Sequence, residues 1–356
     1  MNKKIKFGNR LIGTGEPLYF IADIGANHDG NINKAFKLIE LAKEAGADAA
    51  KFQNFQASKI VSKLGFENLG SQLSHQSSWK KSVYEVYEDA SISLNWTSLL
   101  KAKCKEVGID FFTSAYDFES VDAVDPYVDL YKIGSGDITW IEILEYISRK
   151  NKPVLIATGA SDMKDVVRAM NAIQAITDDV VLMQCNTNYT VDKDKFKYVN
   201  LNVLKNFEQR FPDTILGLSD HTFGHATVLG AIALGAVVIE KHFTDSNDNE
   251  GPDHKFAMNP KTWREMVENA NEVYYALGDG IKRIEENEKK SLIVQRRSLR
   301  ATSNFEVGHT ITHEDLEPLR PIPEDGFSPY QINELVGKKM ISPILKGEHI
   351  TKKHIQ

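Results

Sequence analysis

The chain has 356 residues, of which 42% are hydrophobic and 26% are charged, and its formal net charge is −6. This length exceeds the roughly 250–300 residues at which a single core stops growing, so we expect one large and one small domain. The net charge argues against a nucleic-acid surface, and no apolar run reaches the ~18 residues that span a bilayer. The basic N-terminal segment precedes no apolar run, so we expect a cytoplasmic protein without a membrane partner.

Short apolar segments of strand length alternate with segments of helical periodicity from residue 19 onward. The expected strands cover 19–27, 48–53, 109–116, 130–136, 153–159, 180–186, 214–221 and 236–243. Helical patterns lie between them, for example at 33–46, 161–174 and 224–235. Eight such units within about 250 residues predict an α/β fold of the (β/α)₈ TIM-barrel type, in preference to an open doubly wound sheet.

The connection over residues 54–95 is much longer than the usual loop of about 2–6 residues. It contains the aromatic and polar run SHQSSWKKSVYEVYED at 74–89. Two interpretations remain open for this insert: a flap that faces the substrate, or a packed excursion on the surface.

The C-terminal part of the sequence differs from the repeating part. Residues 278–290 are charged and helix-like, and the following segment is broken by Gly and Pro. We divide the chain into a barrel domain (1–280), a linker (281–296) and a small domain (297–356). A domain of that size supports only a marginal core, so we expect it to pack against another surface, in this chain or in a partner's.

Polar residues occur where the expected strands end, and alternate residues of a strand share one face. Active sites of (β/α)₈ barrels lie at the C-terminal ends of the strands. Burying this many polar groups in a barrel without partners would be costly, which favours a ligand site. The residues placed there by parity and position are Asp23, Lys51, Gln53, Lys132, Ser135, Ser219, His221, Glu240 and His242.

Two pairs within this set point to specific chemistry. His221 and His242 end neighbouring strands, so their imidazoles can reach one ion, and with water or substrate oxygens they suit a divalent metal acting as a Lewis acid. Lys51 and Lys132 project toward the same mouth and, with hydroxyl and backbone donors, can hold a tetrahedral anion. A single histidine or lysine would more often be structural, and the argument depends on the pairing.

The motifs IADIGANHDG, GADAAKFQ, YKIGSGD, GLSDHT, IEKHFT and GPDH, followed by an LRP segment, run in this order along the chain. With these motifs the chain resembles the sialic acid synthase family, which includes synthases of N-acetylneuraminic, legionaminic and pseudaminic acids. The resemblance implies a barrel joined to an antifreeze-like (SAF) domain. It also implies a homodimer in which that domain covers the partner's active site.

The resemblance also implies roles for individual residues. The family condenses phosphoenolpyruvate with the aldehyde of an N-acylated amino sugar, with Mn²⁺ or Mg²⁺ as cofactor. His221 and His242 match the metal ligands, and Arg320 matches an arginine that reaches the sugar from the other subunit. Asp23 and Glu240 are candidates for proton transfer or sugar orientation. The remaining matches are Lys51, Lys132, Ser114, Ser135 and Ser219 for phosphoenolpyruvate, and Gln53, Tyr189, Glu240 and Asp253 for the sugar, with Thr187 as a further substrate-binding position beside the phosphate.

Four positions depart from the family pattern. Asp23 stands where Glu is common, Ala115 where Pro is usual, Ala157 where Ser is frequent, and Thr187 where Asn is common.

Two other functions stay open. One alternative is another metal-dependent barrel aldolase or a phosphoenolpyruvate-dependent 2-keto acid synthase, which would lack the C-terminal domain. The other is a barrel kept as a binding or structural protein, which the retained lysines and histidines argue against.

Overall fold

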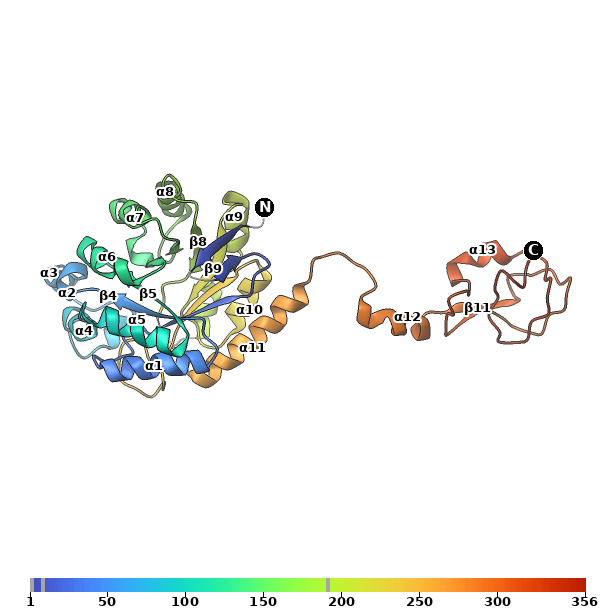
Figure 1. Ribbon diagram of the computed structural model, residues 1–356, viewed down its shortest axis with the longest axis horizontal. Coiled ribbons are helices and arrows are strands. Elements are labelled where there is room, and N and C mark those ends of the chain that lie inside the picture. Colours follow the sequence, from blue (N-terminus) through green and yellow to red (C-terminus); the bar gives the residue numbers. More distant parts are fainter. Residues whose placement is uncertain (1–2, 8–9, 190–192) are drawn as a thin grey trace. The chain divides into compact units, whose positions relative to one another are not determined.

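The chain forms two compact units, Met1–Gly278 and Asp279–Gln356, which Figure 1 shows as a large body and a smaller one. The computed structural model describes residues 3–7, 10–189 and 193–356. Each unit has its own cluster of buried hydrophobic side chains.

The first unit is built on one sheet of parallel strands. Its strand order is β5-β4-β3-β10-β9-β8-β7-β6, and β5 and β6, at the two ends of this order, also lie beside each other. Each strand overlaps one expected segment, which confirms the (β/α)₈ barrel. The strands are β3 (Tyr19–Asp23), β4 (Ala49–Asn54), β5 (Asp110–Ala115), β6 (Tyr131–Ile133), β7 (Val154–Ala157), β8 (Val180–Cys185), β9 (Ile215–Asp220) and β10 (Val238–His242).

Helices follow the strands and cover the outside of the barrel (Figure 1). Their ends carry the residue types expected at helix termini: Asn31 caps α1, Asp162 and Asp165 form a capping box at α8, and Gly108 ends α5 with φ of 73°. The helices are α1 (Ile32–Glu44), α5 (Trp96–Val107), α6 (Phe118–Val124), α7 (Ile141–Ser148), α8 (Met163–Gln174), α9 (Val203–Arg210), α10 (Ala226–Ala233) and α11 (Pro260–Leu277).

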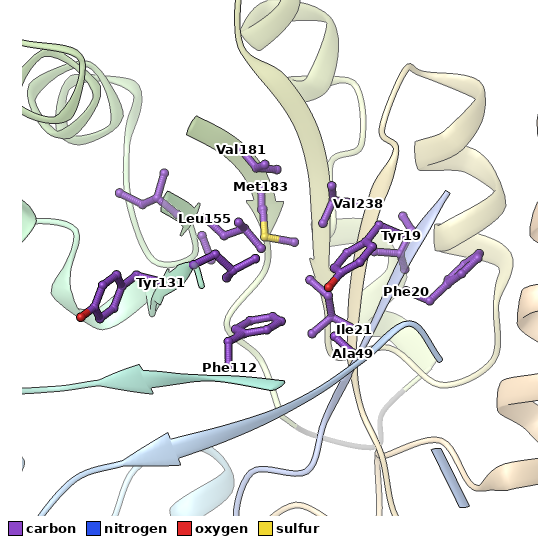
Figure 2. Close-up of a cluster of buried hydrophobic side chains, with 14 of the residues drawn as sticks. Tyr19, Phe20, Ile21, Ala49, Phe112, Tyr131, Leu155, Val181, Met183 and Val238 are labelled. Atoms are coloured by element: carbon purple, nitrogen blue, oxygen red, sulfur yellow. The ribbon is translucent and has the colours of Figure 1, made fainter. Parts of the chain in front are cut away.

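The barrel interior is packed with apolar side chains at mid-height. Figure 2 shows Ile21, Phe112, Leu155, Met183 and Val238 gathered between the strands, and each is at most 2% exposed. Side chains two positions further along a strand face the same interior, one layer nearer the C-terminal ends. Asp23, Ser114 and Glu240, each two positions beyond one of these apolar residues, therefore lie on the next layer of this core.

A hairpin at the N-terminus closes the other end of the barrel. Strands β1 (Lys4–Phe7) and β2 (Arg10–Gly13) pair antiparallel. The Phe7 ring packs edge-on against Tyr19 at 5.7 Å and Phe112 at 6.3 Å between ring centroids. The hairpin was not among the expected elements, although residues 4–7 alternate polar and apolar side chains.

The insert between β4 and α5 folds into short helices. These are α2 (Ala57–Ile60), α3 (Lys63–Asn68), the 3₁₀ helix η1 (Ser74–Ser78) and α4 (Val83–Ala90). Helix α4 begins with a capping box formed by Ser82 and Glu85, and it packs against α2 and α3. The insert is therefore an ordered layer of helical turns.

The second unit is small and has little regular structure. Its elements are η5 (Glu286–Glu288), α12 (Lys289–Gln295), β11 (Ser298–Ala301), β12 (Leu316–Leu319), η6 (Pro329–Gln331) and α13 (Ile332–Leu335). Leu299, Ile311, Met340 and Ile350 belong to its own buried core. The helix-like pattern expected over 278–290 forms helical structure only from residue 286 onward, first as η5 and then as α12. Among the described residues, no helix combines the length and apolar character needed to cross a membrane.

Candidate active site

Strand register brings the predicted polar residues together at the C-terminal end of the barrel. Asp23 on β3 is paired with Lys51 on β4 and with His242 on β10. Glu240 on β10 is paired with Ser219 on β9, and Gln53 on β4 with Ser114 on β5. Parity along each strand therefore identified inward-facing side chains at one end of the barrel, and we call Asp23, Lys51, Lys132, Ser219 and Glu240 the floor of the site.

The two lysines of the floor are each paired with a carboxylate. Lys51 Nζ lies 2.5 Å from Asp23 Oδ2, and Lys132 Nζ donates to Glu240 Oε1 at 3.0 Å. All four side chains are at least 95% buried. The sequence predicted two ammonium groups at the mouth of the barrel but did not indicate these carboxylate partners, which hold the ammonium groups in place before any anion arrives.

Hydrogen bonds fix the carboxylates as well. Asp23 accepts from the Gly25 amide at 3.0 Å and from Gln53 Nε2 at 3.1 Å. Ser219 Oγ donates to Glu240 Oε1 at 3.1 Å, whereas Glu240 Oε2 is buried without a hydrogen-bond partner among the described residues. One carboxylate oxygen of the floor is therefore left for a ligand.

The floor carboxylates stay ionised at neutral pH despite their burial. Burial acts to raise the pKa of Asp23, but the charges of Lys51 and His242 and the hydrogen bond from Lys51 together outweigh it, and the pKa is about 2. Burial likewise opposes ionisation of Glu240, and the charges of Lys132 and Lys51 lower its pKa. In turn, the charges of Asp23 and Glu240 overcome burial and raise the pKa of Lys51. The floor is a set of alternating fixed charges.

The two predicted metal ligands lie side by side above these charges. The ring centroids of His221 and His242 are 5.5 Å apart. His221 Nδ1 lies 3.0 Å from the carbonyl oxygen of Asn186, and among the described residues no hydrogen bond engages its other ring nitrogen, Nε2. Lys195 Nζ donates to the His221 carbonyl at 2.6 Å and fixes its backbone.

Donor chemistry at the histidine pair fits a divalent cation. His242 Nδ1 is buried without a hydrogen-bond partner in the described chain, 3.6 Å from Asp253 Oδ2. Gly25 has φ of 50°, and a Cβ there would lie 2.9 Å from Asp253 Oδ2 and 3.1 Å from His242 Nδ1, so only glycine leaves this space open. Among the described residues no three His, Cys, Asp or Glu side chains converge as a complete metal site. Water or substrate would have to supply the remaining ligands.

A second polar cluster adjoins the floor at the ends of β6, β7 and β8. The Gly159 amide donates to Ser135 Oγ at 2.9 Å. A Cβ at Gly159 would lie 1.8 Å from Thr187 Oγ1 and 2.9 Å from Ser135 Oγ. The hydroxyls of Ser135 and Thr187 thus both lie against residue 159, where only glycine leaves room for them.

A cavity of about 440 Å³ opens above the floor. Six of the predicted site residues line it: Gln53, Ser135, Thr187, Tyr189, His242 and Asp253. The Tyr189 ring lies 4.3 Å from His221 and 6.4 Å from His242 between centroids, and Asp253 accepts from the Ala26 amide at 3.2 Å. The cavity and the charged floor therefore form one site.

Two predicted residues stand outside this group. Ser114 Oγ is buried below the cavity without a hydrogen-bond partner in the described part of the chain. Arg320 belongs to the second unit, where its side chain is exposed and donates from Nε to the Gln295 carbonyl at 2.6 Å. Its predicted role in a partner's site stays a prediction.

The structure adds cavity residues that the sequence did not single out. Asp137 lines the cavity at the end of the 3₁₀ turn η3 (Ser135–Asp137), and burial raises its pKa to about 6 although Lys132 opposes this. Its position in the YKIGSGD motif was the available signal. The insert supplies a whole side of the cavity, which decides between its two interpretations: it faces the cavity. These insert residues are Phe55, Ile60, His75, Trp79, Val86, Tyr87 and Ala90.

Comparisons with known proteins agree with this geometry. Residues 38–282 match the NeuB family, and residues 296–356 match the SAF domain. The chain is 32% identical over 361 residues to the N,N'-diacetyllegionaminic acid synthase of Legionella pneumophila, covering 100% of this chain and 99% of that protein. It is 30% identical over 342 residues to the human N-acetylneuraminate-9-phosphate synthase, covering 96% and 93%.

A solved structure shows the same architecture. The N-acetylneuraminic acid synthetase of Leptospira borgpetersenii, crystallised with citrate, superposes with a TM-score of 0.72 at 25% identity, over 82% of this chain and 96% of that one. The relatives named here are synthases of sialic-acid-type sugars. The chain therefore belongs to the NeuB family of sialic-acid-type synthases and is an enzyme, with a SAF domain at its C-terminus.

Proposed function

We propose that this enzyme joins phosphoenolpyruvate to the aldehyde of an N-acylated amino sugar. With water, the reaction gives a nine-carbon sialic-acid-type sugar acid and inorganic phosphate, by cleavage of the C–O bond of phosphoenolpyruvate. The acceptor is N-acetylmannosamine or a 2,4-diacetamido-trideoxyhexose. The names of the relatives support the product class, and the charged floor supports the donor.

Phosphoenolpyruvate carries a carboxylate and a phosphate, and the floor offers matching donors. Lys51 and Lys132 are the cations, and their existing pairs with Asp23 and Glu240 fix their positions before binding. Ser135 and Ser219 add hydroxyl donors, as does Ser114, whose Oγ has no partner in the described chain. Prepositioned donors of this kind lower the reorganisation needed when an anion binds.

The acceptor would lie above the floor, against the polar side of the cavity. Gln53, Thr187, Tyr189 and Asp253 line that side and can hydrogen-bond hydroxyl and amide groups. The aldehyde carbon must then face C3 of phosphoenolpyruvate, where the new carbon–carbon bond forms.

Proton transfer falls to the floor carboxylates in this proposal. Carbon–carbon bond formation leaves positive charge at C2, and a water molecule adds there before phosphate departs. Glu240 is ionised, and its Oε2 has no partner in the described chain, so it can accept a proton from that water. Asp23 is held by Lys51 and Gln53, which suits a role in orientation.

Mn²⁺ or Mg²⁺ fits this site as cofactor, held by His221 and His242. When bound, it would polarise the aldehyde oxygen as a Lewis acid. The chain's own contribution is to present two imidazole nitrogens and to keep the space beside Gly25 clear.

The single observation that carries the proposal is the pair of buried lysine–carboxylate contacts beside the two imidazoles. Its test is incubation of the enzyme with phosphoenolpyruvate, Mn²⁺ and each aldose, with phosphate and product mass as readouts. Phosphoenolpyruvate labelled with ¹⁸O at the bridging oxygen should pass that label to phosphate. Label retained in the sugar acid, or pyruvate as the product, would contradict the proposal.

Assembly into a homodimer, with Arg320 of one subunit serving the other's site, also stays a prediction, as does the cytoplasmic location. Sedimentation of the full chain measures the first. Mixing an Arg320→Ala chain with a Lys132→Met chain tests the shared site, because one hybrid site would then hold both wild-type residues and recover activity.

A further inference from the structure

The insert gives the cavity two sides of different chemistry. Gln53, Ser135, Asp137 and Asp253 belong to the polar side. The insert lines the cavity with Phe55, Ile60, Trp79, Val86, Tyr87 and Ala90, which we call the insert wall, and with one imidazole, His75. Every member of the insert wall is apolar or aromatic.

Ring contacts hold the insert wall against the barrel. Phe55 packs on Tyr87 of α4 at 5.4 Å and on Tyr116, which follows β5, at 5.9 Å between centroids. Val83 of α4 is fully buried beneath, and the capping box at Ser82 fixes where α4 begins. The wall is therefore a built surface.

The charge around the cavity disfavours a second anionic group. None of the described residues that line the cavity is a lysine or an arginine, whereas two of them, Asp137 and Asp253, carry carboxylates. The two floor lysines are already paired, and phosphoenolpyruvate would engage both. Burial lowers the pKa of His75, the insert's imidazole, so that it is neutral at pH 7. A phosphate on the acceptor would find no described cation there.

Chemistry at the floor fixes which end of the acceptor meets the insert wall. The aldehyde must lie near the floor lysines and the imidazoles of His221 and His242, and none of these belongs to the insert, so we infer that the far end of the sugar extends toward the insert. Burying methyl groups of the sugar against an apolar wall stabilises the complex. A charged group at the same place would have no hydrogen-bond partners from the wall, which costs binding free energy.

We propose that the insert wall selects an acceptor whose end remote from the aldehyde is uncharged and carries apolar substituents, and that it excludes sugar phosphates. A 2,4-diacetamido-2,4,6-trideoxyhexose, with its C6 methyl and second acetyl group, is such an acceptor. This inference rests on the proposed function and narrows it. It also separates this chain from the relative named for a 9-phosphate product.

The test measures binding apart from turnover, using alditols that lack the reactive aldehyde. Calorimetry of the full chain with phosphoenolpyruvate and Mn²⁺ would compare 2,4-diacetamido-2,4,6-trideoxymannitol, N-acetylmannosaminitol and N-acetylmannosaminitol 6-phosphate. An apolar substituent in a fitted pocket changes specificity by about 10–200-fold, so we expect the first to bind at least about 10-fold more tightly than the second. The phosphate should bind weakest. Equal affinities, absence of binding or preference for the phosphate would overturn the proposal.

Variants locate the preference in the insert wall. Val86→Ala and Ile60→Ala should each weaken binding of the trideoxy alditol several-fold more than binding of N-acetylmannosaminitol. Glu88→Ala, an exposed position on the same helix, should leave both unchanged. If both wall variants bind all alditols as the wild type does, the wall is not the selector.

Turnover distinguishes the two proposals. If no aldose consumes phosphoenolpyruvate while the alditol ranking holds, the proposed function fails and the selection stands. If an aldose phosphate is the preferred substrate, the proposed function stands and the selection fails.

Discussion

Replacing Lys132 by Met tests whether the floor is a network of compensating buried charges. Lys132 and Glu240 are each 4% exposed, and their contact is 3.0 Å long. Removing one partner of a buried pair leaves an uncompensated charge and costs about 3–5 kcal/mol. Ser219 still donates to Glu240 in the variant, so we expect a loss near about 3 kcal/mol at pH 8.

The pH dependence gives the sharper test. In the wild type the pKa of Glu240 is lowered, so its contribution to stability is present above the unfolded value near 4.5 and is lost as pH falls. Without Lys132, burial dominates and raises that pKa above the unfolded value. The stability of Lys132→Met should therefore be closest to wild type at pH 5 and fall as pH rises toward 8, which is the opposite sign.

Urea unfolding followed by tryptophan fluorescence measures this in the barrel alone, because all four tryptophans lie before residue 279. The double variant Lys132→Met/Glu240→Gln should recover most of the loss. Lys150→Met, which breaks a solvent-exposed pair with Asp122, should cost at most about 1 kcal/mol at either pH. A loss in Lys132→Met that is the same at pH 5 and pH 8, with no recovery in the double variant, would refute the reasoning.

Three further variants address other parts of the site. Gly159→Ala places a Cβ 1.8 Å from Thr187 Oγ1, so we expect about 1–3 kcal/mol of destabilisation and a higher KM for phosphoenolpyruvate; adding Thr187→Ala should restore part of both, and kinetics with urea titration check this. The pKa of Asp137 is raised to about 6, so the folded protein loses stability as pH rises from about 4 to 6. Asp137→Asn should therefore be more stable than the wild type by about 1–3 kcal/mol at pH 7 but not at pH 4. His221→Ala should abolish turnover, and it should abolish Mn²⁺ binding measured by calorimetry, while changing the free energy of unfolding by no more than about 1 kcal/mol. The control variant His225→Ala should keep both turnover and Mn²⁺ binding.

Strand positions and the faces of their side chains could be predicted because parallel strands repeat every two residues. That period predicted that Asp23, Lys51 and Glu240 face the interior of the barrel near the ends of their strands. The β1–β2 hairpin was missed because its strands have only four residues each and stand outside the repeating pattern.

Contacts within the site could be predicted less well than its membership. Lysine side chains are long and flexible, so parity indicates the face that Lys132 shares but not that its ammonium meets Glu240. The insert wall joins residues up to 35 positions apart, from Phe55 to Ala90, that approach only through the packing of short helices. No sequence period connects such residues, so only the folded structure decided that the insert faces the cavity.

The aromatic contacts of Phe7 with Tyr19 and Phe112 close the N-terminal end of the barrel, so the barrel is open only at the end that carries the site. A molecule that binds at the floor must therefore enter and leave through the cavity. In the proposed reaction, phosphate and the sugar acid would therefore leave through the same opening by which the next substrates enter.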